Sequence, residues 1–218
     1  MRLRLSELER ARKRPKAVAA AQFQPGKGMR PTFGGYWVLA ARLYHKLFKM
    51  NDALCVQKAH DYFLQHCRAK LMNRANFDHE IALYSGRLDD YIADYLTLNQ
   101  PVVQTNKRVQ FKKITGHFVS GAIGRLDMIP AGGFAATNFE LKASDWKSQL
   151  RTPIIQQAIA DELNRRSSEI RVGMYCIASG NHEYVTLSAA DIQQAIAELE
   201  NVLNTVETEV KRLKRSKP

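Results

Sequence analysis

Apolar side chains recur every three or four residues through much of the first hundred positions. This spacing places them on one face of an α-helix. It predicts helices over 36–49, 52–72 and 78–97, and Pro101 ends the third. The clearest apolar face belongs to the third helix and consists of Ile81, Tyr84, Leu88, Tyr91, Ile92 and Tyr95.

Beyond residue 100 the pattern changes to alternating or continuous apolar runs with glycine-containing turns between them. Such runs, bounded by turns, are typical of strands. Hairpins are expected to link the first three strands, and a helix over 152–166 follows the third. The predicted strands are 107–114, 117–129, 135–143, 170–178 and 183–187.

Capping signals mark a helix near each end of the chain. Ser6 with Glu9 predicts a short basic helix over 6–20, and Ser188 with Asp191 caps the last helix. The apolar residues of the last helix alternate in steps of four and three, which predicts a seam that packs against the body of the protein or against a partner helix. The seam consists of Ile192, Ile196, Leu199, Leu203, Val206, Val210 and Leu213.

The order of these elements indicates an α+β fold of the α/β/α kind. We expect a central mixed sheet of about five strands with flanking helices. The 218 residues fit one domain. Its expected parts are a basic N-terminal arm and helical region (1–98), a sheet core (99–187) and a C-terminal helix with a basic tail (188–218).

The formal net charge is +12, and all of the excess lies at the two ends. Residues 1–30 hold nine Lys or Arg and two Glu, and residues 211–218 hold five basic residues and no acid. Basic ends suit a polyanion such as nucleic acid, because neutralised phosphates release counterions. A solubility feature is the alternative interpretation.

Other features of the composition exclude several classes of protein. No run of 18 apolar residues exists, and the charged N-terminus does not resemble a secretory signal. Three cysteines without CxxC spacing predict neither disulfides nor a zinc or iron–sulfur site. We therefore expect a cytoplasmic protein without membrane contact.

Three charged residues interrupt two strands that otherwise look buried: Asp127, Glu140 and Lys142. Glu140 and Lys142 share one face of their strand, and the turn at 131–133 is expected to bring that strand back beside Asp127. Two close carboxylates repel each other unless a cation lies between them, and Mg²⁺ prefers such ligands. A lysine beside the metal can position water or stabilise charge on phosphorus, so the set predicts phosphodiester hydrolysis.

A Glu-x-Lys or Asp-x-Lys spacing alone is weak, since it arises by chance about once or twice in such a chain. Asp145 with Lys147 and Glu209 with Lys211 are two further examples here. Only Glu140 and Lys142 follow a strand that ends in an acid.

These residues resemble the PD-(D/E)xK nuclease superfamily, and within it the RecB-like and phage-exonuclease-like branch. The matching pattern is Gly124-x-Leu126-Asp127, a step of thirteen residues to Glu140-x-Lys142, and then a helix with a glutamine. The resemblance implies a restriction-endonuclease-like core that cleaves DNA with Mg²⁺ or Mn²⁺. Asp127, Glu140 and the Leu141 carbonyl would bind the metal, and Lys142 would be the catalytic lysine.

The resemblance also implies further site residues. Gln156 is the expected glutamine, with Gln157 as the alternative. Many RecB-like members have a tyrosine four residues later, where this chain has Ala160. An upstream histidine or glutamate often joins the metal, which leaves His60 or Glu80 open, with His79 as a further option.

Side chains near the expected site could contact nucleic acid. Lys147 and Arg151 flank the start of the 152–166 helix and could contact phosphate. Trp146 could stack on a base, whereas Trp37 lies in an apolar helix and fits a core position. Ser144 could donate a hydrogen bond near the metal.

Three hypotheses follow from the sequence. The first is a Mg²⁺-dependent deoxyribonuclease, either an exonuclease or an endonuclease. The second is a non-catalytic nucleic-acid-binding subunit with a nuclease-like fold. The third is a nuclease subunit that is active only in a larger assembly, as a homo-oligomer or with a partner protein bound through the 192–213 helix.

Overall fold

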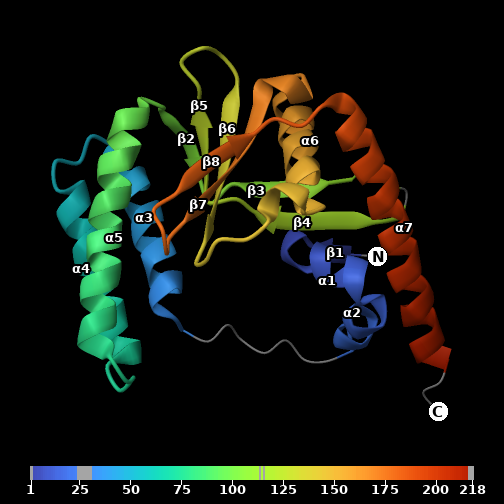
Figure 1. Ribbon diagram of the computed structural model, residues 1–218, viewed down its shortest axis with the longest axis horizontal. Coiled ribbons are helices and arrows are strands. Elements are labelled where there is room, and N and C mark those ends of the chain that lie inside the picture. Colours follow the sequence, from blue (N-terminus) through green and yellow to red (C-terminus); the bar gives the residue numbers. More distant parts are fainter. Residues whose placement is uncertain (1, 24–30, 113, 115, 216–218) are drawn as a thin grey trace.

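The computed structural model describes residues 2–23, 31–112, 114 and 116–215. A five-stranded sheet lies between two groups of helices, and a three-stranded sheet adjoins it (Figure 1). The α+β fold class and the five-stranded mixed sheet are therefore confirmed. The strands are β1 (Arg2–Arg4), β2 (Val102–Thr105), β3 (Arg108–Phe111), β4 (Phe118–Ala122), β5 (Arg125–Met128), β6 (Phe134–Glu140), β7 (Ile170–Cys176) and β8 (His182–Val185).

The helices lie mostly where the apolar spacing predicts them, and the expected helix over 6–20 is divided. The 3₁₀ turn η1, α1 and α2 take its place, and the break falls at Pro15, which has no backbone N–H to continue the first helix. The helical elements are η1 (Leu5–Glu7), α1 (Leu8–Lys13), α2 (Pro15–Ala21), α3 (Phe33–Lys49), α4 (Cys55–Leu71), α5 (Phe77–Leu98), η2 (Trp146–Ser148), α6 (Arg151–Leu163), η3 (Ser167–Glu169) and α7 (Ala189–Arg215).

The five-stranded sheet separates two hydrophobic cores. Its order is β2-β5-β6-β7-β8, and only β6 and β7 run parallel. Tyr175 and Phe139 pack against α3, α4 and α5 on one face. Val172 and Leu126 belong to the core on the other face, together with α6 and α7. Because side chains alternate along a strand, neighbouring residues of β5, β6 and β7 serve different cores.

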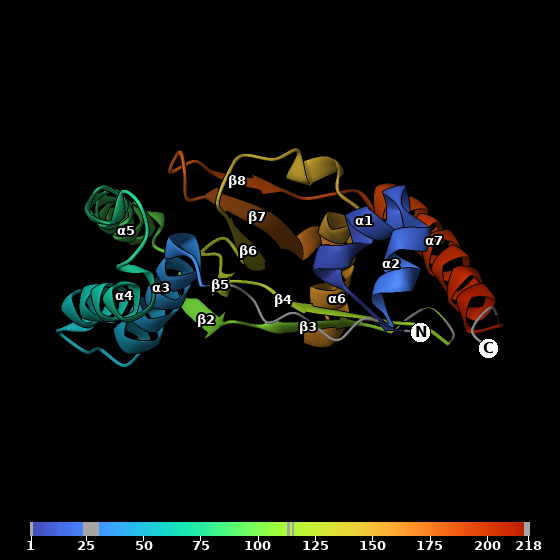
Figure 2. The same ribbon diagram turned by 90° about the horizontal axis from the view of Figure 1, so that it is seen from below.

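The three-stranded sheet was not predicted. Its order is β1-β4-β3, with β1 parallel to β4 and β3 antiparallel to it. Figure 2 shows β3 and β4 along one side of the molecule. The expected strand 117–129 is in fact two strands, because the chain leaves the small sheet after Ala122 and enters the large one at Arg125. Hairpins join β3 to β4 and β5 to β6, whereas β4 and β5 belong to different sheets.

The last helix packs along the body of the protein. Ser188 and Asp191 exchange hydrogen bonds at its start, as the capping signal predicts. Its seam residues Ile192, Leu199, Leu203 and Val206 are fully buried against α2, α1 and α6. The seam is therefore filled within the chain and gives no support for a partner helix. Among the described residues no helix is both long and apolar enough to cross a membrane.

The β5–β6 turn offers a direct test of local geometry. Gly132 and Gly133 have φ of +93° and +90°, so alanine is strained at either position. An added Cβ at Gly133 would lie 2.4 Å from the Glu169 carbonyl oxygen, whereas Gly132 faces open space. Gly132→Ala is expected to lower the free energy of unfolding by about 1–2 kcal/mol, and Gly133→Ala by clearly more. Equal losses in urea denaturation would contradict this account.

Candidate functional site

The β5–β6 hairpin carries the expected catalytic residues but does not bring Asp127 to Glu140. The register pairs Asp127 with Ala135 and Arg125 with Thr137. Glu140 lies five positions beyond Ala135, close to the end of β6 that is remote from the turn. The expectation that the turn returns Glu140 and Lys142 to Asp127 is therefore wrong.

The two carboxylates also point to opposite faces of the sheet. Asp127 shares its face with Arg125 and Phe139, toward α3 and α5, whereas Glu140 alternates with Phe139 and points toward α6. The cause is the position of the turn. A step of thirteen residues places its two ends opposite each other only when the turn lies midway, and this turn begins directly after Met128.

Asp127 belongs to a buried polar network. Arg125 Nε donates to Asp127 Oδ2 at 2.7 Å, and Arg125 also donates to the Tyr91 hydroxyl. That hydroxyl lies 2.6 Å from His45 Nε2. Both members of the Arg125–Asp127 pair are fully buried. Burial raises the pKa of Asp127 to about 6, although Arg125 opposes the rise.

Glu140 lies in a second, partly exposed cluster at the end of β6. Arg151, the first residue of α6, forms an ion pair with one carboxylate oxygen, and the Ser144 hydroxyl donates to the other. The Glu140 side chain is 19% exposed and Arg151 is 20% exposed. Lys142 follows two residues later and is exposed. An acid, a cation and a hydroxyl therefore gather near the solvent at one strand end, and the exposed Lys142 follows in the chain.

Glu9 joins this cluster from the N-terminal arm. Its Oε1 accepts a hydrogen bond from the Leu150 backbone N at 2.5 Å. Burial lowers the pKa of Arg151, and the nearby Glu9 carboxylate opposes this shift. Arg151 thus interacts with a carboxylate from α1 and another from β6, so the basic arm is attached to the start of α6.

The backbone after Glu140 is fixed from two directions. The Ile177 N–H donates to the Glu140 carbonyl at 2.8 Å, and the Ala178 N–H donates to the Leu141 carbonyl at 3.1 Å. The Leu141 side chain covers Gly34 so closely that a Cβ there would lie 1.8 Å from its Cδ2. A Cβ at position 34 would therefore require the Leu141 side chain to move from its observed position.

Comparisons with known proteins give little further guidance. No protein-family model matches the chain, and no curated protein matches it. A solved structure from Eubacterium rectale, named as a candidate exonuclease, is 9% identical with a TM-score of 0.46, and the match covers 88% of this chain and 72% of that one. The structure named SSO0001 is also 9% identical, with a TM-score of 0.33 and coverage of 88% and 84%. At this level of similarity, neither structure indicates an activity for this chain.

Gln156 is buried and fully engaged with the backbone. Its side-chain nitrogen donates to the Ser167 and Leu187 carbonyls at 2.9 and 3.0 Å, and its oxygen accepts from the Leu187 N–H at 2.9 Å. These bonds join α6 to the segments before β7 and α7. Gln157 lies partly exposed and donates to Asp161 at 2.7 Å. Neither amide is directed at Glu140 by these bonds.

The two glutamines form a matched pair for a stability test. Gln156→Met leaves the partly buried Leu187 N–H and two carbonyls without their partner, so the free energy of unfolding is expected to fall by about 1–3 kcal/mol. Gln157→Met removes one exposed bond and is expected to change it by less than about 0.5 kcal/mol. Chemical denaturation measures both. Equal effects would show that Gln156 does not join these segments.

The upstream residues lie away from Glu140. His60 is on α4, which packs on α3 and α5 at the side of the molecule (Figure 1). Its Nε2 lies 2.8 Å from Asp89 Oδ1. His79 and Glu80 stand in the first turn of α5, and His79 is exposed. The structure therefore brings none of the three to the Glu140 cluster.

Trp146 and Lys147 of η2 are engaged with other parts of the protein. Trp146 is 5% exposed and belongs to the core, so its ring is not open for stacking. Lys147 pairs with Glu183 at 2.8 Å, and both side chains are about half exposed. Trp37 is fully buried and stacks on Tyr175 with ring centroids 5.7 Å apart, as its apolar helix predicts.

The arrangement does not fit the expected Mg²⁺ site. Within the described ranges no group of three His, Cys, Asp or Glu could hold a metal ion. The Oδ1 atom of Asp127 has no hydrogen-bond partner, yet it is buried on the face opposite Glu140. A metal at Glu140 would have one carboxylate from this set, and its other ligands would have to come from water and substrate.

Arg125 and Glu9 of the N-terminal arm contribute to the two clusters but were not predicted from the sequence. Arg125 stands inside an apolar strand two residues before Asp127, a spacing that places both side chains on one face. Opposite charges at this spacing in an apolar strand indicate a buried ion pair. Nothing in the local sequence connects Glu9 to Leu150, since 141 positions separate them.

Proposed function

We propose that the chain is a nuclease that hydrolyses phosphodiester bonds in DNA at the Glu140 cluster. The observation that carries the proposal is the meeting of Glu140, Arg151 and Ser144 at the exposed end of β6, with Lys142 two residues further on. The resemblance of 124–142 to PD-(D/E)xK nucleases agrees with it. The cleavage assay described below distinguishes cleavage at DNA ends from internal cleavage.

The side chains suit the charges of the reaction. A phosphodiester gains negative charge on its non-bridging oxygens when water attacks phosphorus, and nearby cations stabilise that charge. We assign this role to the exposed Lys142 ammonium and propose that Arg151 holds the phosphate. The Glu140 carboxylate is then the group that accepts the proton from water.

Dependence on Mg²⁺ or Mn²⁺ is part of the proposal and derives from the resemblance. A bound divalent ion would supply Lewis acidity and an activated water. The described residues do not assemble three ligands for it, so no role is assigned to Asp127, His60, Glu80 or the Leu141 carbonyl in this chemistry. Addition and chelation of metal test this directly.

The test is a cleavage assay on end-labelled single-stranded and double-stranded DNA with Mg²⁺, with Mn²⁺ and with EDTA. We expect cleavage with metal and none with EDTA. A Lys142→Met protein purified in the same way shows whether the activity belongs to this chain. If no substrate is cut under either metal, the nuclease proposal fails for the chain.

A non-catalytic nucleic-acid-binding subunit is the second proposal. The observation in its favour is the burial of Asp127 in an ion pair with Arg125, on the opposite face from Glu140. This proposal predicts binding of nucleic acid without cleavage in the same samples. Activity that appears only after a partner protein is added would instead support the assembly hypothesis.

A further inference from the structure

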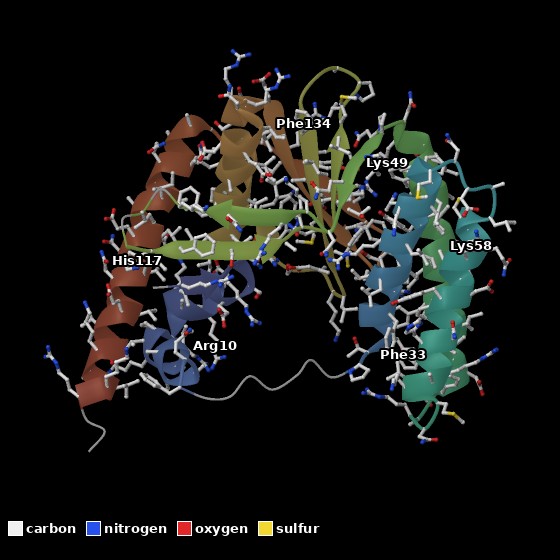
Figure 3. The ribbon with its side chains drawn as sticks, turned by 180° about the vertical axis from the view of Figure 1, so that it is seen from behind. Arg10, Phe33, Lys49, Lys58, His117 and Phe134 are labelled. Carbon is white, nitrogen blue, oxygen red and sulfur yellow. The ribbon has the colours of Figure 1, made fainter. Side chains whose placement is uncertain are left out.

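The three-stranded sheet has one open face, which we call the outer face. Leu3, Val109 and Val119 point inward and are buried. Their neighbours along each strand therefore point outward. The outer face consists of Arg2, Arg4, Arg108, Gln110, Phe118, Ser120 and Ala122, with Lys112 directly after β3. Figure 3 shows β3 and β4 at the front, without a helix over them.

Cations stand at both edges of the outer face, and the strands contribute no acid to it. β1 supplies Arg2 and Arg4, and the other edge supplies Arg108 and Lys112. All four are exposed, and none takes part in an ion pair within the described residues. The face therefore has four positive charges.

Phe118 lies between two of these cations. The register places Arg2 beside it on β1, and the Arg2 guanidinium lies 5.3 Å from the ring centroid. The Lys112 ammonium lies 5.9 Å from the same centroid. Next along the sheet, the exposed Arg4 and Gln110 flank Ser120, which is only 6% exposed. An aromatic ring among cations and hydrogen-bond donors suits bases and phosphates together.

Carboxylates lie at the edges of the sheet, and the Glu7 carboxylate, just after β1, accepts a hydrogen bond from the Arg4 N–H at 2.9 Å. Asp161 and Glu162 of α6 line a cavity of about 600 Å³ with Arg108 and Lys112. Lys107, which points away from the outer face, forms an ion pair with Glu162. The charge of Glu162 is thus balanced by Lys107, and Asp161 and Glu7 leave the four cations of the outer face in excess.

The basic surface continues onto the last helix. Arg2 lines a cavity of about 370 Å³ with Lys211 and Lys214 of α7 and with Glu207. The two ends that carry the excess charge in the sequence therefore meet beside the sheet. Lys211 is paired with Glu207 at 3.2 Å, so Arg2 and Lys214 extend the positive surface beyond the sheet, which suits an extended chain of phosphates.

We propose that the outer face of β1-β4-β3 binds single-stranded nucleic acid, with the backbone along the cations and a base on Phe118. A single strand is favoured over a duplex because an aromatic ring on a flat sheet is useful only when bases are unstacked and accessible. The duplex keeps its bases inside and is entered by a helix or ribbon in a groove.

An anionic membrane is the competing partner for a basic surface. Membrane-binding surfaces place large apolar side chains among their cations. The exposed large apolar residues of the described chain lie elsewhere, mostly on α3, α4 and α5 or directly beside them, and none belongs to β1, β3, β4 or α7. Phe118 is the single large apolar side chain of the outer face, and one partly buried ring flanked by two cations is too little to anchor a protein in a bilayer.

This inference names the substrate strand of the proposed nuclease, and in that sense it rests on the proposed function. Binding itself can be measured without cleavage. A labelled 20-nucleotide single strand is titrated with the full chain in EDTA, and fluorescence anisotropy gives the dissociation constant. Arg108→Gln/Lys112→Gln is expected to weaken binding at least tenfold and to reduce the salt slope by about 1.4, since each lost phosphate contact contributes about 0.7.

Arg68→Gln/Lys70→Gln is the matched control, because these exposed cations of α4 have the same residue types and change the net charge equally. We expect less than a twofold effect from it. Phe118→Leu keeps the apolar volume and removes the ring, with an expected loss of about tenfold. Circular dichroism checks that each variant is folded, and the Arg108/Lys112 variant carries the test if Phe118→Leu is not.

Several results would overturn the proposal. They are equal binding by the Arg108/Lys112 variant and the wild type, tighter binding of the matching duplex, and competition by phosphatidylserine vesicles at similar charge concentration. Binding without any cleavage would refute the nuclease proposal and leave the outer face supported. Cleavage of single strands with an unchanged KM in the Arg108/Lys112 variant would refute the outer face and leave the nuclease proposal supported.

Discussion

Arg125→Met is expected to lower the free energy of unfolding by about 3–5 kcal/mol at pH 8, because it leaves the buried Asp127 carboxylate without its cation. Both side chains are fully buried, so water cannot replace the lost partner. Arg125 is also hydrogen-bonded to the Tyr91 hydroxyl, which would keep only His45. Urea denaturation followed by circular dichroism measures the loss.

The loss in free energy of unfolding caused by Arg125→Met should be larger at high pH than at low pH. Burial raises the pKa of Asp127 to about 6 in the folded chain, whereas an unfolded aspartate titrates near about 3.9. A raised folded pKa means that the contribution of Asp127 to stability is present below pH 4 and is lost as the pH rises through about 6. Without Arg125 the folded pKa rises further, so the deficit relative to the wild type should be smaller at pH 5 than at pH 8.

Two controls define the result. Lys147→Met breaks an exposed pair with Glu183 and is expected to cost less than about 1 kcal/mol at either pH. Arg125→Met/Asp127→Leu removes both buried charges and should recover most of the stability, with no added pH dependence. A deficit that is the same at pH 5 and pH 8 would show that Asp127 is not the responsible group. Cleavage retained by the folded double variant would separate Asp127 from the chemistry.

Local signals in the sequence predict the helices well. The face from Ile81 to Tyr95 gives α5, and Ser188 with Asp191 gives the start of α7. Both signals act within one or two helical turns, so neighbouring residues contain them fully. The seam of α7 predicts burial, but the identity of the covering surface depends on α2, which lies far away in the sequence.

Long-range pairing limits what the sequence predicts of the sheets. Residues 117–129 look like one strand because Val119, Ile123 and Leu126 are apolar, yet the chain changes sheets between Ala122 and Arg125. β1 has only three residues and gains its partner from β4. Pairing of this kind depends on contacts across more than a hundred positions, which no local pattern encodes.

The candidate site shows the same limit at the level of single residues. Spacing correctly places Glu140 on a strand and Gln156 on the following helix, but β6 ends at Glu140, so Lys142 does not lie on the strand as predicted. The side-chain partners are decided by the position of a turn and by neighbouring elements. The turn after Met128 moves Glu140 away from Asp127, and α6 brings Arg151 to it.

Lys142→Met is expected to reduce the rate of DNA cleavage by about 10²–10⁴-fold while leaving the free energy of unfolding within about 0.5 kcal/mol of the wild type. The side chain is exposed, so its loss opens no cavity, and methionine keeps the length of the stem. Glu140→Gln should reduce the rate to a similar degree, with some loss of stability because its ion pair with Arg151 is broken.

The matched control is Lys147→Met. Lys147 is an exposed lysine five residues further on that pairs with Glu183, and this variant should cleave like the wild type. Single-turnover rates with saturating enzyme separate chemistry from binding, since a lysine that only attracts the substrate would change KM and leave the chemical step intact. If the Lys142 and Lys147 variants cleave at equal rates, Lys142 is not catalytic.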